Sequence, residues 1–223
     1  MTGMQVALLD TDEYVFSEEE RQLVVEVVSG AEGQVRGLLR GLPERLNVAV
    51  YPTDLVIPDV GDGGVTPDKD LIELSVDPGH PGGVVSVVRG SFRTTLFHAA
   101  HHAATAHLVT AKDETLLGYA VQEGLATAFE RDFAGPRPLY AAYDPAEAER
   151  WLEELMTTAE GRYEDWFYSR SAGCRRIGYR VGTYIVDTAT ANSQESAASL
   201  VGASTAEVLE MAHVDGPSNP SSA

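Results

Sequence analysis

The sequence is poor in cysteine, in basic residues and in long apolar runs. Its single cysteine, Cys174, excludes an internal disulfide and a zinc site built from several thiolates. The 16 Lys and Arg residues are outnumbered by 34 Asp and Glu, which gives a formal net charge of −18. That charge would repel a phosphate backbone or an anionic membrane surface, so neither is expected as a partner. No segment approaches the roughly 18 apolar residues of a membrane span.

The bulk composition predicts one globular domain with a loose end. With 223 residues, of which 43% are hydrophobic, the chain is long enough for one well-packed core. We expect a single domain over residues 1–213 and a disordered tail over 214–223, which is rich in Ser, Pro and Gly. The first ten residues lack a basic segment followed by an apolar core, so a cytoplasmic protein is expected. A secreted protein that has lost its leader would look the same.

The pattern of apolar residues predicts an α+β fold. Short strands are expected at 4–9, 46–51 and 71–77, with a Gly-, Asp- and Pro-rich loop over 58–69. Ser17 and Glu20 have the spacing of a capping box, and apolar residues at helical spacing follow them. Further helices are expected over 91–109, 115–132, 146–158, 177–191 and 205–211. We therefore predict a small, mostly antiparallel sheet followed by a helical half.

Four histidines occur within ten residues of the predicted helix 91–109. His98 and His102 are four residues apart, so their side chains lie about 40° from each other around the helix. Zinc is commonly bound by neutral imidazoles on one helix face, and this pair meets that requirement. His101 lies about 60° away on the other flank and is a weaker partner, whereas His107 lies on the opposite side.

A third ligand follows from the lengths of the two predicted helices. The chain rises roughly 12 Å from His102 to Thr110, turns at residues 111–114, and descends roughly 12 Å from Thr115 to Glu123. Glu123 would therefore lie level with His102. A carboxylate among the apolar residues of this second helix is costly to bury unless it meets a cation. The ligand set predicted from spacing is His98, His102 and Glu123, with zinc as the ion.

These motifs resemble those of a known group of metallopeptidases. The segment His98-Ala-Ala-His-His102 and the segment Glu123-Gly-Leu-Ala are similar to the H-E-x-x-H and downstream E-G-L-A motifs of gluzincins. The closest resemblance is to the predicted zinc-dependent proteases long grouped as a domain of unknown function, over roughly residues 70–190. Shared features include Thr94-Thr95-Leu96-Phe97 and the segment Gly178-Tyr179-Arg180-Val181-Gly182. The resemblance implies a zincin-like fold and hydrolysis of peptide bonds through a zinc-activated water.

The chain departs from the motif at Ala99, where the family has a glutamate that takes a proton from the water. Alanine cannot do this, so the chain as it stands is expected to be inactive. Either a native glutamate was replaced to inactivate the enzyme, or the chain is a natural zinc-binding pseudo-protease that recognises peptides or proteins. The intact ligand spacing favours the replacement. Gluzincins also use a late tyrosine or histidine to stabilise the oxyanion, and Tyr179 is the best candidate, with Tyr184 and His213 as alternatives.

The substrate is expected to be a peptide or protein that lies along the sheet edge. In the families that the chain resembles, a strand just before the zinc helix forms this edge, which here would be residues 71–77. The alternative is that residues 71–77 form an ordinary edge strand without this role. Two other features have alternative interpretations. The aromatic residues between Tyr163 and Tyr168 are either core or substrate wall, and His80 is either an exposed loop residue or a further contact. A helical domain whose histidines only pack is the remaining alternative to metal binding.

Overall fold

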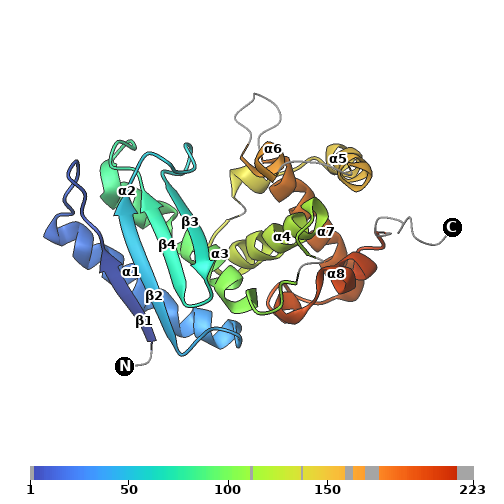
Figure 1. Cartoon of the computed structure of the whole chain (residues 1–223), viewed down its shortest axis with the longest axis horizontal. Helices are drawn as coiled ribbons and strands as arrows, with labels where there is room; N and C mark the ends of the chain where they lie inside the picture. Colours follow the sequence, from blue (N-terminus) through green and yellow to red (C-terminus); the bar gives the residue numbers. More distant parts are fainter. Residues whose placement is uncertain (1–2, 111–112, 137, 159–162, 169–175, 215–223) are drawn as a thin grey trace. The chain divides into compact units, whose positions relative to one another are not determined.

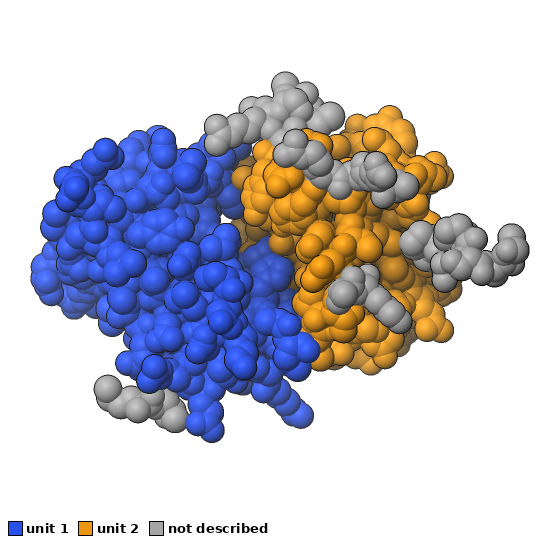
Figure 2. Space-filling view, in the orientation of Figure 1, with its two compact units in different colours: residues 1–107, 133–135 blue, residues 108–132, 136–223 orange. Residues whose placement is uncertain are grey.

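The computed structural model describes residues 3–110, 113–136, 138–158, 163–168 and 176–214. The chain forms two compact units, coloured separately in Figure 2. Unit 1 comprises residues 1–107 and 133–135, and unit 2 comprises residues 108–132 and 136–223. Nearly all of the tail expected to be disordered, residues 215–223, lies outside the described part. The expectation of a single domain stays a prediction.

Unit 1 contains a four-stranded sheet and the helices that pack on one of its faces (Figure 1). In chain order its elements are β1 (Gly3–Leu8), α1 (Glu18–Leu38), β2 (Arg45–Pro52), β3 (Asp62–Asp68), β4 (Leu71–Val76), α2 (Gly83–Gly90) and α3 (Phe92–Thr105). Alternate residues of the strands are buried, such as Val48 and Val50 in β2 and Ile72 and Leu74 in β4. This period-two pattern places one apolar face of the sheet against the helices.

The sheet corrects two predictions from the sequence. Its strand order is β1-β2-β4-β3, with β1 and β2 parallel, β2 and β4 parallel, and only β3 and β4 antiparallel. The expected mostly antiparallel sheet is therefore wrong. Strand β4, the predicted edge, lies between β2 and β3, so both of its backbone edges are paired.

The true edge strand next to β4 is β3, in the segment predicted to be a loop. Two features made this strand hard to predict from the sequence: Gly63 and Gly64 have no side chains, and Pro67 has no backbone N–H to donate. Proline is tolerated in an edge strand, where one row of N–H groups is unpaired. The missing side chain of Gly64 has a packing reason, since a Cβ there would lie 3.0 Å from Leu74 Cδ2 and 3.1 Å from Thr95 Cγ2. Strand β3 thus approaches α3 closely.

Unit 2 is helical. Its elements are α4 (Leu116–Phe133, of which residues up to Asp132 belong to the unit), η1 (Leu139–Ala141), α5 (Pro145–Thr157), α6 (Tyr163–Phe167), α7 (Ile177–Ser193), η2 (Ser199–Gly202) and α8 (Thr205–Met211). Helix α7 is central, because α5, α6, α8 and η1 all pack against it. Among the described residues, no helix has the length and apolar content needed to cross a membrane.

Two glycines allow α4 and α7 to touch backbone to backbone. A Cβ added at Gly182 would lie 1.8 Å from the carbonyl oxygen of Ala120, and one at Gly124 would lie 2.2 Å from that of Gly182. Neither distance is possible for a real side chain, so both positions require glycine. The close approach occurs beside Glu123, which precedes Gly124.

Candidate metal centre

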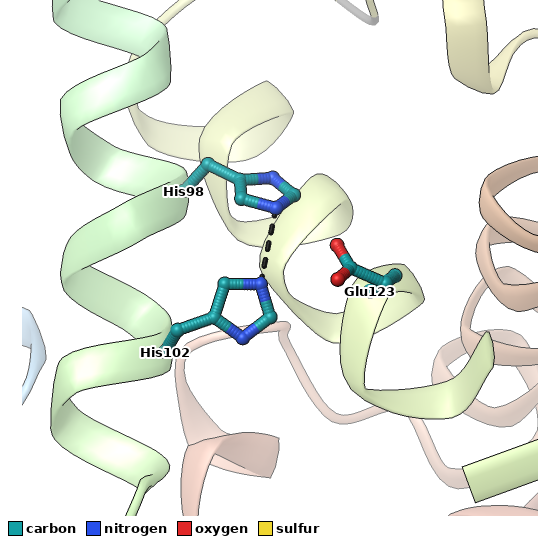
Figure 3. A group of neighbouring side chains, drawn as sticks. All are labelled: His98, His102 and Glu123. Carbon is teal, nitrogen blue, oxygen red and sulfur yellow. Dashed lines mark hydrogen bonds between the residues drawn. The ribbon is translucent and has the colours of Figure 1, made fainter. Parts of the chain in front are cut away.

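His98 and His102 lie one turn apart on the same face of α3, as the sequence predicts. Their Nε2 atoms are 3.1 Å apart, and the two rings meet edge to face, with centroids separated by 4.9 Å and planes inclined at 61° (Figure 3). Two nitrogens that bind one tetrahedral zinc ion at about 2.0–2.1 Å lie about 3.3 Å from each other. The spacing of the imidazole pair therefore fits a shared ion. Both side chains are half-buried.

The other histidines of unit 1 are placed differently. His101 is 1% exposed and lies inside the unit, and its ring centroid is 6.2 Å from that of His102. His107 is exposed and lies beside Gly41, outside α3, because the helix ends at Thr105 and not at the expected residue 109. His80 is half-buried, with its ring against Gly61. Of these side chains, His98 and His102 are the pair that has ligand geometry.

Ala99 follows the first of these histidines and lies against strand β3. Its side chain is 1% exposed, and its carbonyl oxygen accepts a hydrogen bond of 2.9 Å from the hydroxyl of Thr66. A Cβ built on Gly64 would lie 3.6 Å from the Ala99 Cβ. Position 99 thus faces the edge strand at its glycine.

A second set of hydrogen bonds also links strand β3 to α3. The buried carboxylate of Asp62 accepts hydrogen bonds from Ser91 Oγ at 2.6 Å and from Thr95 Oγ1 at 2.8 Å. Ser91 is the N-cap of α3, and Thr95 lies one turn before the first histidine. Asp62 and Thr66 therefore hold the helix that carries the two imidazoles against the edge strand.

Glu123 lies on α4 in unit 2 and is half-buried. Its Oε1 accepts a hydrogen bond of 3.3 Å from the hydroxyl of Tyr163, in helix α6. Tyr163 stacks on Phe167 with ring centroids 4.3 Å apart, and its edge meets Tyr168 at 5.5 Å. Outer hydrogen bonds of this kind orient the ligands of a metal. Sequence reasoning did not identify Tyr163 as a partner of the carboxylate.

Four tyrosines of unit 2 share the electrostatic influence of this carboxylate, and we call them the tyrosine cluster: Tyr140, Tyr163, Tyr168 and Tyr179. Burial raises the pKa of each phenol, and the negative charge of Glu123 raises it further. The four hydroxyls therefore stay protonated at neutral pH, and two of them already donate hydrogen bonds, Tyr163 to Glu123 and Tyr140 to Glu130.

Tyr179, the predicted oxyanion donor, is buried within this cluster. Its ring meets that of Tyr140 at 5.1 Å and that of Phe167 at 5.6 Å. Tyr184 lies five residues further along α7, about 140° around the helix, and its hydroxyl donates to Glu149 at 3.0 Å. Exposed His213 follows α8. The structure thus associates Tyr179, but not Tyr184, with the Glu123 tyrosines.

The core interpretation of the aromatic segment 163–168 is confirmed for two of its side chains, and the substrate-wall interpretation stays a prediction. Trp166 and Phe167 are buried and belong to the core of unit 2. Tyr163 contacts Glu123, and Tyr168 is 52% exposed. The segment therefore packs through one pair of side chains and presents the other pair outside the core.

His98, His102 and Glu123 are a group of side chains that could hold a metal ion, and Figure 3 draws all three. A family model described as "Predicted Zn-dependent protease (DUF2268)" matches residues 69–210, more than half of the chain. The chain belongs to this family. The matched segment contains α3, α4 and α7 and hence all three residues. Zinc dependence is what the family description implies for them.

The predicted Zn-dependent protease family is thus supported by the whole matched segment as well as by its motifs. The resemblance read from His98, His102 and the Glu123 segment is confirmed by this match. None of the curated proteins compared with the chain matches it significantly.

Proposed function

We propose that the chain is a zinc metallopeptidase of the gluzincin type that carries an alanine where its catalytic base belongs. His98, His102 and Glu123 are the proposed zinc ligands, with the fourth position left for water or substrate. The observation that carries the proposal is the 3.1 Å separation of the two imidazole Nε2 atoms on α3. Two neutral imidazoles and one carboxylate are a known ligand set of catalytic zinc sites.

Each part of the site has a distinct proposed task. Bound zinc would supply a Lewis acid that polarises a carbonyl group and activates water. Tyr163 orients the carboxylate of Glu123, and Tyr179 is the proposed donor to the oxyanion. Ala99 cannot move a proton, so the chain would lack the two to four orders of magnitude in rate that a general base contributes.

We propose that the peptide substrate pairs with the free edge of β3. Antiparallel pairing with β4 uses one edge of β3, so the other edge can receive an extended chain. Strand β3 packs on α3 and is fastened there by Asp62 and Thr66. A peptide on this edge would lie beside position 99.

Ala99 also favours a second function. A chain that binds zinc and peptide without cutting would act as an interaction module, and the small buried side chain at position 99 is suited to that role. The two functions differ in what a restored glutamate does. In the enzyme it completes the catalytic machinery, whereas in the interaction module it changes nothing that the assay detects.

The substitution Ala99→Glu, assayed on a mixture of unstructured peptides, tests the proposal. Zinc-loaded A99E should cleave peptides at least about a hundredfold faster than the parent chain, because a positioned carboxylate contributes at least that factor. Adding His98→Ala to A99E should remove the gain. A99E that binds zinc, keeps the parental circular dichroism spectrum and still cuts no peptide would contradict the enzyme and leave the interaction module.

A further inference from the structure

Arg176 is a half-buried cation held over two tyrosine rings. It immediately precedes α7, and its guanidinium carbon lies 5.4 Å from the ring centroid of Tyr140 and 5.9 Å from that of Tyr179. Within the described part of the chain, no hydrogen bond or ion pair occupies its N–H groups. The rings therefore attract the guanidinium through their faces, a contact that does not use its in-plane N–H donors.

Of the other half-buried arginines that the structure describes, three are paired with acids (Arg21, Arg36 and Arg131), Arg93 donates to backbone carbonyls and to Gln34, and Arg180 lies over the ring of Trp151. Arg36 meets Glu32 at 2.8 Å, and Arg131 is hydrogen-bonded to both Asp132 and Asp187. In a chain with 34 acidic and 16 basic residues, such pairing is the expected state of a partly desolvated guanidinium. Arg176, like Arg180, lies over aromatic rings instead, and the rings under Arg176 belong to the tyrosine cluster. The planar fork of Arg176 has the geometry for a bidentate contact with a carboxylate.

The same tyrosines connect Arg176 with Glu123. Burial is the main cause of the raised pKa of Tyr140 and Tyr168; the charge of Glu123 adds to it, and the charge of Arg176 opposes it. The ring of Tyr179 lies under Arg176 and is also influenced by Glu123. All of these residues belong to unit 2. A ligand group at Arg176 would thus lie beside the tyrosine cluster, of which one member, Tyr163, is hydrogen-bonded to the proposed zinc ligand Glu123.

We propose that Arg176 binds a carboxylate group of the peptide substrate. The carboxylate is either the free C-terminus of the peptide or the side chain of an Asp or Glu residue. The proposal rests on the proposed function, since a peptide is expected here only if Glu123 belongs to a peptide-cutting or peptide-binding site. It makes Arg176 a specificity-determining residue, distinct from the zinc ligands and from position 99.

Three peptides titrated calorimetrically into the zinc-loaded full chain test this proposal. They are acetyl-tetraalanine with a free carboxylate, its C-terminal amide, and the amide in which the last alanine is glutamate. Ala99 prevents cleavage during the titration. Arg176→Ala and Arg176→Lys are compared with Arg180→Ala, because Arg180 lies one turn further along α7 and is held over the ring of Trp151 at 5.9 Å.

At least one of the carboxylate peptides should bind about tenfold more tightly than the neutral amide, as one charge-assisted contact predicts. Tighter binding of the peptide with the free carboxylate would identify the C-terminus as the group that Arg176 binds. Tighter binding of the glutamate-containing amide would identify an acidic side chain. R176A should lose the preference, R176K should retain part of it, and R180A should keep it. Equal binding of all three peptides to the parent chain, or a preference that survives R176A, would overturn the proposal.

Zinc content measured on the same samples separates the two proposals. A carboxylate preference that depends on Arg176 in a chain that takes up no zinc would leave the carboxylate site standing and refute the metallopeptidase. One zinc per chain with no preference would refute the role of Arg176 and leave the zinc site standing.

Discussion

The hydroxyl of Tyr163 donates a hydrogen bond to Oε1 of Glu123 across 3.3 Å. This contact joins α6 to α4 and restrains the rotation of the carboxylate about its last bond. The ring of Tyr163 is itself fixed by stacking on Phe167. Glu123 therefore presents its carboxylate with one oxygen oriented by a neutral donor, which is the arrangement that supports a metal ligand.

Replacing Tyr163 by phenylalanine should weaken zinc binding. The change removes one hydroxyl and keeps the ring, so the packing against Phe167 is preserved while the carboxylate loses its orienting donor. Loss of such a contact typically lowers metal affinity about 10- to 100-fold. Competition with a chromophoric chelator measures it. Tyr184→Phe, which removes a hydroxyl bonded to Glu149 on the same unit, should leave zinc affinity unchanged. Equal affinities of Y163F and the parent chain would refute the role assigned to Tyr163.

Gly182→Ala should severely destabilise the chain. The added methyl group would lie 1.8 Å from the carbonyl oxygen of Ala120, a backbone atom that cannot move without separating α4 from α7. We expect a loss of about 3 kcal/mol or more in the free energy of unfolding, at or beyond the upper end of overpacking effects. Urea denaturation followed by circular dichroism gives the value. Gly202→Ala is the control, because nothing lies within 4 Å of a Cβ there. A G182A variant as stable as G202A would contradict the helix contact.

The substitution Glu20→Gln should make the free energy of unfolding depend less on pH in the acidic range. Although burial raises the pKa of the Glu20 carboxyl, hydrogen bonds from Tyr14 and Ser17 lower it more, so the net shift is downward. A carboxyl with a lowered folded pKa adds stability above its unfolded pKa, about 4.3, and loses it as the pH falls through the folded value.

The E20Q variant should therefore be about 1 kcal/mol less stable than the parent chain at pH 7, the usual size of a capping interaction. The difference should shrink as the pH is lowered below about 4. Urea denaturation at several pH values follows both quantities. Glu19→Gln, in the same first turn but 73% exposed, is the control and should show little change. A stability difference that stays constant down to pH 3 would refute the charge-dependent cap.

Several helix starts and the histidine pair were predictable because they depend on local chemistry, whereas α3 ends at Thr105 and not at the expected residue 109. The capping boxes at Ser17 and Ser204 and the Asp144-Pro145 start all form as their residue types predict. The ligand spacing of His98 and His102 follows from helix geometry alone. Each of these features involves residues within a few positions of one another in the chain.

Strand pairing and the tyrosine cluster were not predictable because both depend on distant segments. The parallel pairing of β2 with β4 joins strands separated by β3, and the alternation within β4 does not distinguish a central strand from an edge. Tyr163 reaches Glu123 from 40 residues further along the chain. The neighbouring residues Trp166 and Phe167 are aromatic, which predicts that the segment packs into a core, and both are buried. The sequence does not indicate which of the aromatic rings contacts the Glu123 carboxylate.

The most direct test of the central claim is the zinc stoichiometry of the purified full chain, measured by atomic emission after zinc loading and dialysis. The account predicts one zinc per chain, loss of that zinc in His98→Ala, His102→Ala and Glu123→Ala, and full retention in His107→Ala. A parent chain that binds no zinc, or a double variant lacking both His98 and His102 that still binds one ion per chain, would contradict it.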